Sequence, residues 1–268
     1  MIDDGKRLLL GVRIDAVDYE GALHRILAAA RAGTSLGVSA LAVHGVMTGV
    51  LDAQQRWRIN NLDLVTPDGQ PVRWALNRLY KTGLPDQVHG AVLTAKLLPH
   101  LESERIAVYW YGTTPEILAR LQAELQRRHP GLVVAGMEPS RFGTATPAEL
   151  DAIAARITAC GAQICFVGLG CPRQETFVAA MRDRLPMPAL AVGAAFTYLS
   201  GELREPPAWM RRSGLEWAWR LALEPRRLWR RYLLLNPAYL GLLAVQRVTG
   251  RTVRPDGRAP SPDEPVPA

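Results

Sequence analysis

Residues 164–175 read ICFVGLGCPRQE, and the rest of the chain is organised around them. An apolar run at 164–167 ends on Gly168 and Gly170, and a helical pattern follows. In an open parallel sheet, ligands bind outside the carboxyl ends of the strands, where N–H groups at the start of the next helix favour phosphate. Glycines there let a ligand approach the backbone closely, and they are equally typical of a simple tight turn. The stretch therefore predicts a strand, a turn and a helix, with a candidate phosphate site.

The same stretch argues against one class of protein. A dinucleotide fingerprint would need a third glycine near position 173, where this chain has Arg173. A nicotinamide-dependent oxidoreductase is therefore disfavoured, although it remains a rival interpretation.

The flanking sequence alternates between strand and helix patterns. Strands are expected at residues 8–14, 36–43, 62–65, 106–111, 132–136 and 163–167, and helices at 18–30, 72–80, 91–101, 113–129 and 146–160. Thr146 and Glu149 have the spacing of a capping box. Such alternation is typical of an α/β protein with a parallel sheet flanked by helices. We expect a core of this class over residues 1–203.

A basic, tryptophan-rich segment, which we call the arm, covers residues 204–246. Between 204 and 232 its arginines are Arg204, Arg211, Arg212, Arg220, Arg226, Arg227, Arg230 and Arg231, against only three glutamates. Arginine suits phosphate, and basic clusters are attracted to anionic lipid at about 1 kcal/mol per residue. Interspersed tryptophans are expected where one side of an element is apolar and the other wet. A nucleic-acid patch, or a core helix with a solvated basic face, would give a similar pattern.

Composition bounds the remaining possibilities. The chain has 268 residues, 48% hydrophobic, and a net charge of +7 that is concentrated in the arm. Three cysteines without paired CxxC spacing suggest a reducing, cytoplasmic compartment. We see neither a signal-peptide pattern nor a run of about 18 apolar residues. The proline-rich residues 247–268 lack apolar periodicity, so we expect them to be disordered.

Four polar side chains outside the arm are candidates for a site. Asp68 follows a short strand within Pro67-Asp68-Gly69, which is a turn sequence, yet a carboxylate at a strand end can also meet substrate. His44 follows the 36–43 run and is either structural or in contact with ligand. Gln174 could bond a sugar or nucleotide, whereas Glu175 could merely complement the helix dipole. Thr197 follows the turn after a second apolar run at 189–192.

Several ordered motifs carry a family resemblance. They are residues 66–69 (TPDG), 111–112 (YG), 129–131 (HPG), 167–175 (VGLGCPRQE), 215–217 (LEW) with Arg220, and 224–227 (EPRR) with 230–232 (RRY). Over roughly residues 8–243, the chain resembles the WecG/TagA/CpsF family of bacterial glycosyltransferases. The resemblance implies a Rossmann-like core and a basic helical appendage that associates with membrane.

The resemblance also implies an activity. Such an enzyme moves a sugar from a UDP-sugar to a polyprenyl-diphosphate-linked saccharide in surface polysaccharide synthesis, with inversion in a single displacement. Asp68 would be the general base and Gln174 a pocket residue. Backbone N–H groups near Gly168 and Gly170 would stabilise the departing diphosphate. So would arginines among Arg220, Arg227 and Arg231, which fall in matching motifs.

Three positions depart from the family pattern. The family commonly has asparagine at His44, Ser-Asp after Gly90 where this chain has Ala91 and Val92, and aspartate at Thr197. We keep His44 and Thr197 as substrate-binding candidates, and the donor stays open between N-acetylmannosamine, its uronic acid and glucose.

Partners and location follow from these expectations. No Asp-x-Asp pair stands at a strand end, so we expect no metal, and the sequence indicates no cofactor. We expect a UDP-sugar donor, a lipid-linked acceptor, an anionic membrane surface at the inner face of the plasma membrane, and no nucleic acid. A homo-oligomer is left open. The alternative is a non-catalytic module that binds a membrane surface or nucleic acid.

Overall fold

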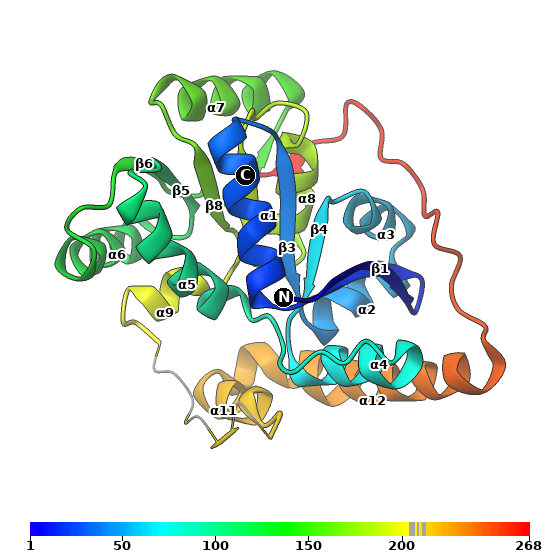
Figure 1. Cartoon of the computed structure of the whole chain (residues 1–268). Coiled ribbons are helices and arrows are strands. Elements are labelled where there is room, and N and C mark those ends of the chain that lie inside the picture. Colours follow the sequence, from blue (N-terminus) through cyan, green and yellow to red (C-terminus); the bar gives the residue numbers. More distant parts are fainter. Residues whose placement is uncertain (204–206, 208, 211–212) are drawn as a thin grey trace.

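The centre of the protein is a six-stranded sheet in which every strand is parallel to its neighbours (Figure 1). The computed structural model describes residues 1–203, 207, 209–210 and 213–268, without the side chains of Arg227, Arg230 and Arg231. The strand order is β4-β3-β9-β8-β5-β6. The strands are β3 (Leu36–Leu41), β4 (Leu64–Pro67), β5 (Val108–Gly112), β6 (Val134–Glu138), β8 (Ile164–Gly168) and β9 (Pro188–Ala191). The predicted α/β class with a parallel sheet is confirmed.

Helices cover both faces of this sheet because side chains alternate along each buried strand. In β5, Tyr109 and Tyr111 belong to one hydrophobic core, and Val108 and Trp110 belong to the other. The first core is closed by α2 (Val43–Leu51), α3 (Ala53–Asn60), α4 (Gln70–Tyr80), α7 (Pro147–Ala159) and α8 (Arg173–Met181). The second is closed by α1 (Tyr19–Ala32), α5 (Gly90–Ser103), α6 (Pro115–Arg128) and α9 (Ala195–Leu199). Both faces of the central strands are therefore buried, which explains why these strands have continuous apolar sequences.

The N-terminus forms a hairpin where a single strand was expected. β1 (Asp3–Leu9) pairs antiparallel with β2 (Val12–Val17). The turn between them has Leu10 at φ 54° and Gly11 at φ 87°, which suits a tight two-residue hairpin turn. The apolar run at 8–14 continues through this turn, so periodicity alone does not reveal the break.

The arm folds as α11 (Glu216–Leu223) and α12 (Pro225–Thr249), and α12 lies beside α4 (Figure 1). Tyr239 is buried and donates a hydrogen bond of 3.1 Å to the carbonyl of Pro71. Other apolar side chains of α12, including Leu233, Leu234 and Leu240, are more than half exposed. In the described part of the chain, no helix has the length and apolar character needed to span a membrane. The predicted boundary at 203/204 adjoins residues outside this description.

The last residues return across the molecule from the end of α12 (Figure 1). β10 (Val266–Pro267) pairs antiparallel with β7 (Thr144–Ala145), and Val266 and Ala268 are buried. Glu264 also forms an ion pair of 2.8 Å with Arg58. This differs from the disorder expected for 247–268. The contacts are made with segments far away in sequence, which local composition does not reveal.

Candidate active site

A pocket of about 680 Å³ lies at the carboxyl ends of β3, β4, β5, β8 and β9. Its walls are the residues that follow those strands, and α11 and the start of α12 add Glu216, Trp217, Arg220, Tyr232 and Asn236. This is the edge of a parallel sheet where ligands are expected. Among the described residues, no three His, Cys, Asp or Glu side chains are grouped as metal ligands would be. The pocket therefore combines loops of the core with side chains of the arm.

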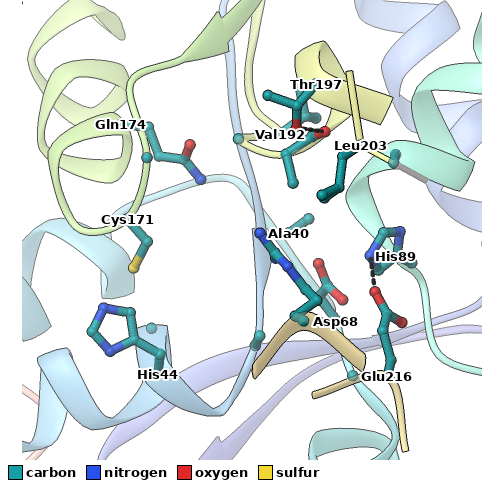
Figure 2. Close-up of a pocket in the computed structure, with 18 of the residues that line it drawn as sticks. Ala40, His44, Asp68, His89, Cys171, Gln174, Val192, Thr197, Leu203 and Glu216 are labelled. Carbon is teal, nitrogen blue, oxygen red and sulfur yellow. Dashed lines mark hydrogen bonds and ion pairs between the residues drawn. The ribbon is translucent and has the colours of Figure 1, made fainter. Parts of the chain in front are cut away.

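Asp68 projects into this pocket from the turn between β4 and α4 (Figure 2). Gly69, at φ 89°, lets the chain reverse before α4 begins at Gln70. The N–H of Gly90 donates to Asp68 Oδ2 at 3.4 Å. Burial raises the pKa of Asp68, the charges of His89 and Arg220 oppose the rise, and Glu216 adds to it. Asp68 therefore lies in a turn, and its carboxylate also lines the pocket, so the two interpretations in the sequence analysis are compatible.

His89 stands across from Asp68 and contacts the arm. Its Nε2 lies 3.0 Å from Glu216 Oε1, and the two side chains are only 14% and 16% exposed. Burial by itself lowers the pKa of His89, but the charge of Asp68 and the hydrogen bond and charge of Glu216 raise it to about 9. The two carboxylates therefore favour the protonated form of His89. The sequence analysis did not select it, although it adjoins the unusual Gly90-Ala91 pair.

The opposite side of the pocket is built around a buried carboxyl group. Glu175 has no exposed surface, and its Oε1 accepts from Ser39 Oγ at 3.1 Å and from Gln174 Nε2 at 2.9 Å. Burial raises the pKa of Glu175. Gln174 Oε1 is buried, has no hydrogen-bond partner among the described groups, and belongs to a residue that lines the pocket. Glu175 thus orients the Gln174 amide, which is more than complementing a helix dipole.

The two predicted glycines have different surroundings. A Cβ on Gly168 would lie 2.7 Å from the ring of Phe196, so close packing is one reason for glycine there. Gly170 has φ 76°, and a Cβ would meet nothing within 4 Å. Its carbonyl accepts the N–H of Gln174 at 2.9 Å as α8 begins. Both glycines line the pocket, and their contact with phosphate remains a prediction.

The other predicted residues divide into three groups. His44, beside Cys171, and Thr197 both line the pocket (Figure 2), and the Thr197 hydroxyl donates to the carbonyl of Ala194 at 2.9 Å. Arg220 also lines it, with an Nη2 to Glu224 Oε2 distance of 3.9 Å. The side chains of Arg227 and Arg231 lie outside the described residues.

One wall of the pocket contains backbone strain that the sequence analysis did not anticipate. Thr113 has φ 60°, an unusual conformation for a β-branched residue. It is held by its N–H, which donates to the Gly168 carbonyl at 3.1 Å, and by its carbonyl, which accepts from Ser140 N–H at 3.0 Å. Such residues cluster at functional sites. Thr114, next to it, caps α6.

A pocket with carboxylates, a polar amide and an arginine at the edge of a parallel sheet is where an α/β enzyme is expected to bind its ligand. The sequence matches the "Glycosyl transferase WecG/TagA/CpsF family" over residues 7–253. The chain belongs to this family and is a glycosyltransferase. It is similar to the "N-acetylglucosaminyldiphosphoundecaprenol N-acetyl-beta-D-mannosaminyltransferase" of Bacillus spizizenii, with 27% identity over 194 residues, which cover 72% of this chain and 73% of the relative.

Proposed function

We propose that the protein transfers a sugar from a UDP-sugar to a polyprenyl-diphosphate-linked saccharide, with inversion and without a metal ion. The observation that carries this proposal is the pocket itself, in which the Asp68 carboxylate and Arg220 of the arm face one space at the strand ends. The name of the Bacillus relative, whose acceptor is a diphosphoundecaprenol-linked N-acetylglucosamine, supports the acceptor class.

The chemical step needs one base. Asp68 takes the proton from the acceptor hydroxyl as its oxygen attacks the anomeric carbon of the donor sugar. The new carbon–oxygen bond forms while the bond to the UDP oxygen breaks, and UDP leaves with the electron pair. Because burial raises the pKa of Asp68, its carboxylate binds that proton more strongly than an exposed one would. A single displacement of this kind inverts the anomeric centre.

The leaving diphosphate gains negative charge as the bond breaks, and donors aimed at it lower the barrier. Arg220 and the N–H groups of the Gly168–Gly170 turn are our candidates, with Arg227 and Arg231 as further ones. Gln174, His44 and Thr197 would contact the donor. N-acetylmannosamine is the first donor to test because the relative is named for it.

The arm would also hold the protein at the membrane that contains the acceptor. Exposed apolar side chains of α12, among them Leu233, Leu234 and Leu240, lie on an element that also carries many arginines. Such a face suits the surface of an anionic bilayer. We therefore place the protein as a peripheral protein on the cytoplasmic face of the membrane.

A UDP-release assay tests the reaction. Purified protein is given a panel of UDP-sugars, with and without lipid-linked acceptor, in the presence of EDTA. We expect UDP release that requires one particular donor and the lipid-linked acceptor. This release should persist in the presence of EDTA. If a folded, vesicle-bound protein releases no UDP from any donor, the binding-module alternative replaces the transferase.

The variant Asp68→Asn tests the role of the base. Removing a general base typically costs about 10²- to 10⁴-fold in rate, so turnover should fall by that factor while UDP affinity and melting temperature stay near wild type. The exposed His24→Gln on α1 serves as the control and should keep full activity. A variant that loses its fold would favour Asp68 as a turn former only.

A further inference from the structure

His89 joins the core to the arm at the edge of the pocket. It is the N-cap residue of α5, and its N–H donates to the Tyr19 hydroxyl at 3.0 Å. Its ring meets Glu216, the first residue of α11, at 3.0 Å. The backbone of His89 is therefore bonded to α1, and its imidazole is bonded to the arm.

Charged and aromatic side chains from three elements act on this ring, while its Nδ1 is buried with no hydrogen-bond partner among the described groups. Asp68 faces it from the β4–α4 turn, and Glu216 and Arg220 face it from α11. Tyr198 of α9 meets it edge to face, with ring centroids 6.1 Å apart. Two carboxylates and one guanidinium thus act on one imidazole, and this balance favours the protonated ring.

The contact matters for α11 because it joins the first residue of that helix, Glu216, directly to the core. None of the eight residues of α11 is fully buried, so apolar packing contributes only modestly to its docking. Glu216 and Arg220 are four residues apart and lie on the same side of the helix. Fixing Glu216 against His89 therefore also fixes where Arg220 enters the pocket.

We propose that His89 is a positioning residue of the transferase: as a cation between Asp68 and Glu216, it keeps the base ionised and docks α11 so that Arg220 faces the leaving diphosphate. This rests on the proposed function, since it assigns Asp68 and Arg220 their roles in transfer. His89 need not touch substrate. It acts through the carboxylates on either side of it.

The proposal has a signature in pH that a merely structural histidine would not produce. At low pH, activity falls as Asp68 becomes protonated. At high pH, it falls as His89 loses its proton, because Asp68 then loses a neighbouring positive charge and α11 loses its ion pair. The pKa of His89 is about 9, so the alkaline limb of kcat/KM should lie near that pH in the wild type.

The experiment compares kcat/KM from pH 5 to pH 10 in wild type, His89→Gln, Glu216→Gln and the exposed control His24→Gln. In His89→Gln the alkaline limb should disappear and the acid limb should move up by about 1 pH unit or more, because a cation no longer favours the Asp68 carboxylate. In Glu216→Gln, which keeps a hydrogen-bond acceptor without its charge, the alkaline limb should move to lower pH. His24→Gln should superimpose on wild type.

A second measurement follows the protonation of His89 beside Asp68 and Glu216, and it does not require turnover. Proton NMR of the imidazole Cε1–H, assigned by its absence in His89→Gln, follows protonation of His89 in the intact protein. Its midpoint should lie well above 6.5 in wild type and should fall in both Asp68→Asn and Glu216→Gln. If His89→Gln fails to fold, the resonance is assigned as the one whose midpoint moves in Glu216→Gln, and a wild-type midpoint near 6.5 would overturn the proposal.

The outcomes separate this proposal from the one on which it rests. Turnover by the wild type, together with an unchanged pH profile in His89→Gln, overturns the role of His89 and leaves the transferase intact. No turnover with any donor overturns the transferase, and with it the role of His89, whatever the NMR midpoint. A shifted profile with a raised midpoint supports both.

Discussion

Glu175 is a fully buried carboxyl group whose oxygen is shared by Ser39 and Gln174. Because burial raises its pKa, ionisation in the folded state costs free energy, and the contribution of Glu175 to stability is lost as pH rises through that folded pKa. A glutamine keeps an oxygen that can accept from Ser39 and Gln174, and it does not ionise. We expect Glu175→Gln to increase the free energy of unfolding at pH 8 and to increase it much less at pH 5.

Urea unfolding at the two pH values measures this difference. The matched control is Glu124→Gln, since Glu124 is at the surface and its pKa is lowered by the hydrogen bond from Arg127. That variant should gain nothing at pH 8. A Glu175→Gln protein that is less stable than wild type at pH 8 would show that the ionised carboxylate is favourable in its site.

At the scale of single residues, those that line the pocket were predictable where they follow a strand. The structure places Asp68, Gln174, His44 and Thr197 in one pocket, because parallel strands bring their carboxyl ends to one edge of the sheet. His89 was missed for a physical reason. It does not follow directly from a strand but starts a helix, and its importance depends on Glu216, more than a hundred residues away, which no local pattern connects to it.

At the scale of elements, the turn after β8 depends on close packing against α9. A methyl group on Gly168 would meet the Phe196 ring at 2.7 Å, so Gly168→Ala should cost about 1 to 3 kcal/mol through overpacking. Adding Phe196→Leu should recover part of that loss, because the two sites share one contact. Chemical denaturation of both single variants and the double variant measures the coupling.

Gly170→Ala supplies the contrast. Its Cβ would enter open space, so the cost comes only from the φ of 76° and amounts to about 1 to 2 kcal/mol. Phe196→Leu should not rescue this variant. If Phe196→Leu recovered the same free energy of unfolding in both variants, the recovery would not come from relieving a contact with residue 168.

The strands and helices of the core were predicted well where the periodicity of apolar residues and the helix-capping residues indicate the same boundaries. The Thr146–Glu149 capping box is present, and α7 begins at Pro147, directly after the N-cap Thr146. The N-terminal hairpin could not be predicted, since Leu10 adopts positive φ without a sequence signal. Strand order could not be predicted from the sequence either, because β9 pairs with β3, which lies about 150 residues earlier in the chain.

At the scale of the whole molecule, the arm packs on the core with one side and leaves apolar side chains exposed on another. Periodicity identified an amphipathic segment but could not tell core from lipid or a second subunit, since all three bury the same kind of surface. Tyr239 and Leu228 pack inward in this structure. The exposed leucines are the part that we assign to membrane.

Vesicle sedimentation tests that assignment. The double variant Leu233→Ser, Leu234→Ser removes two side chains that are 55% and 59% exposed, so it should weaken partition into anionic vesicles by at least about tenfold. Leu51→Ser, which alters an exposed leucine of α2, is the control and should bind as wild type does. If the double variant and wild type bind vesicles equally at low and high salt, the exposed leucines of α12 do not contact lipid, and this face would be covered by something else, such as a second subunit.

The hairpin at the start of the chain is completed by its last helix. Gln246 accepts the N–H of Leu10 and donates to the carbonyl of Leu8, both at 2.9 Å, across more than 230 residues. At a synthesis rate of about 5 to 20 residues per second, the hairpin waits on the order of 10 to 50 s for this partner. The N-terminal hairpin must therefore remain incomplete on the ribosome until α12 emerges. We expect this late closure, like the late pairing of β9 with β3, to slow the folding of the whole chain, because contacts between residues far apart in sequence form slowly.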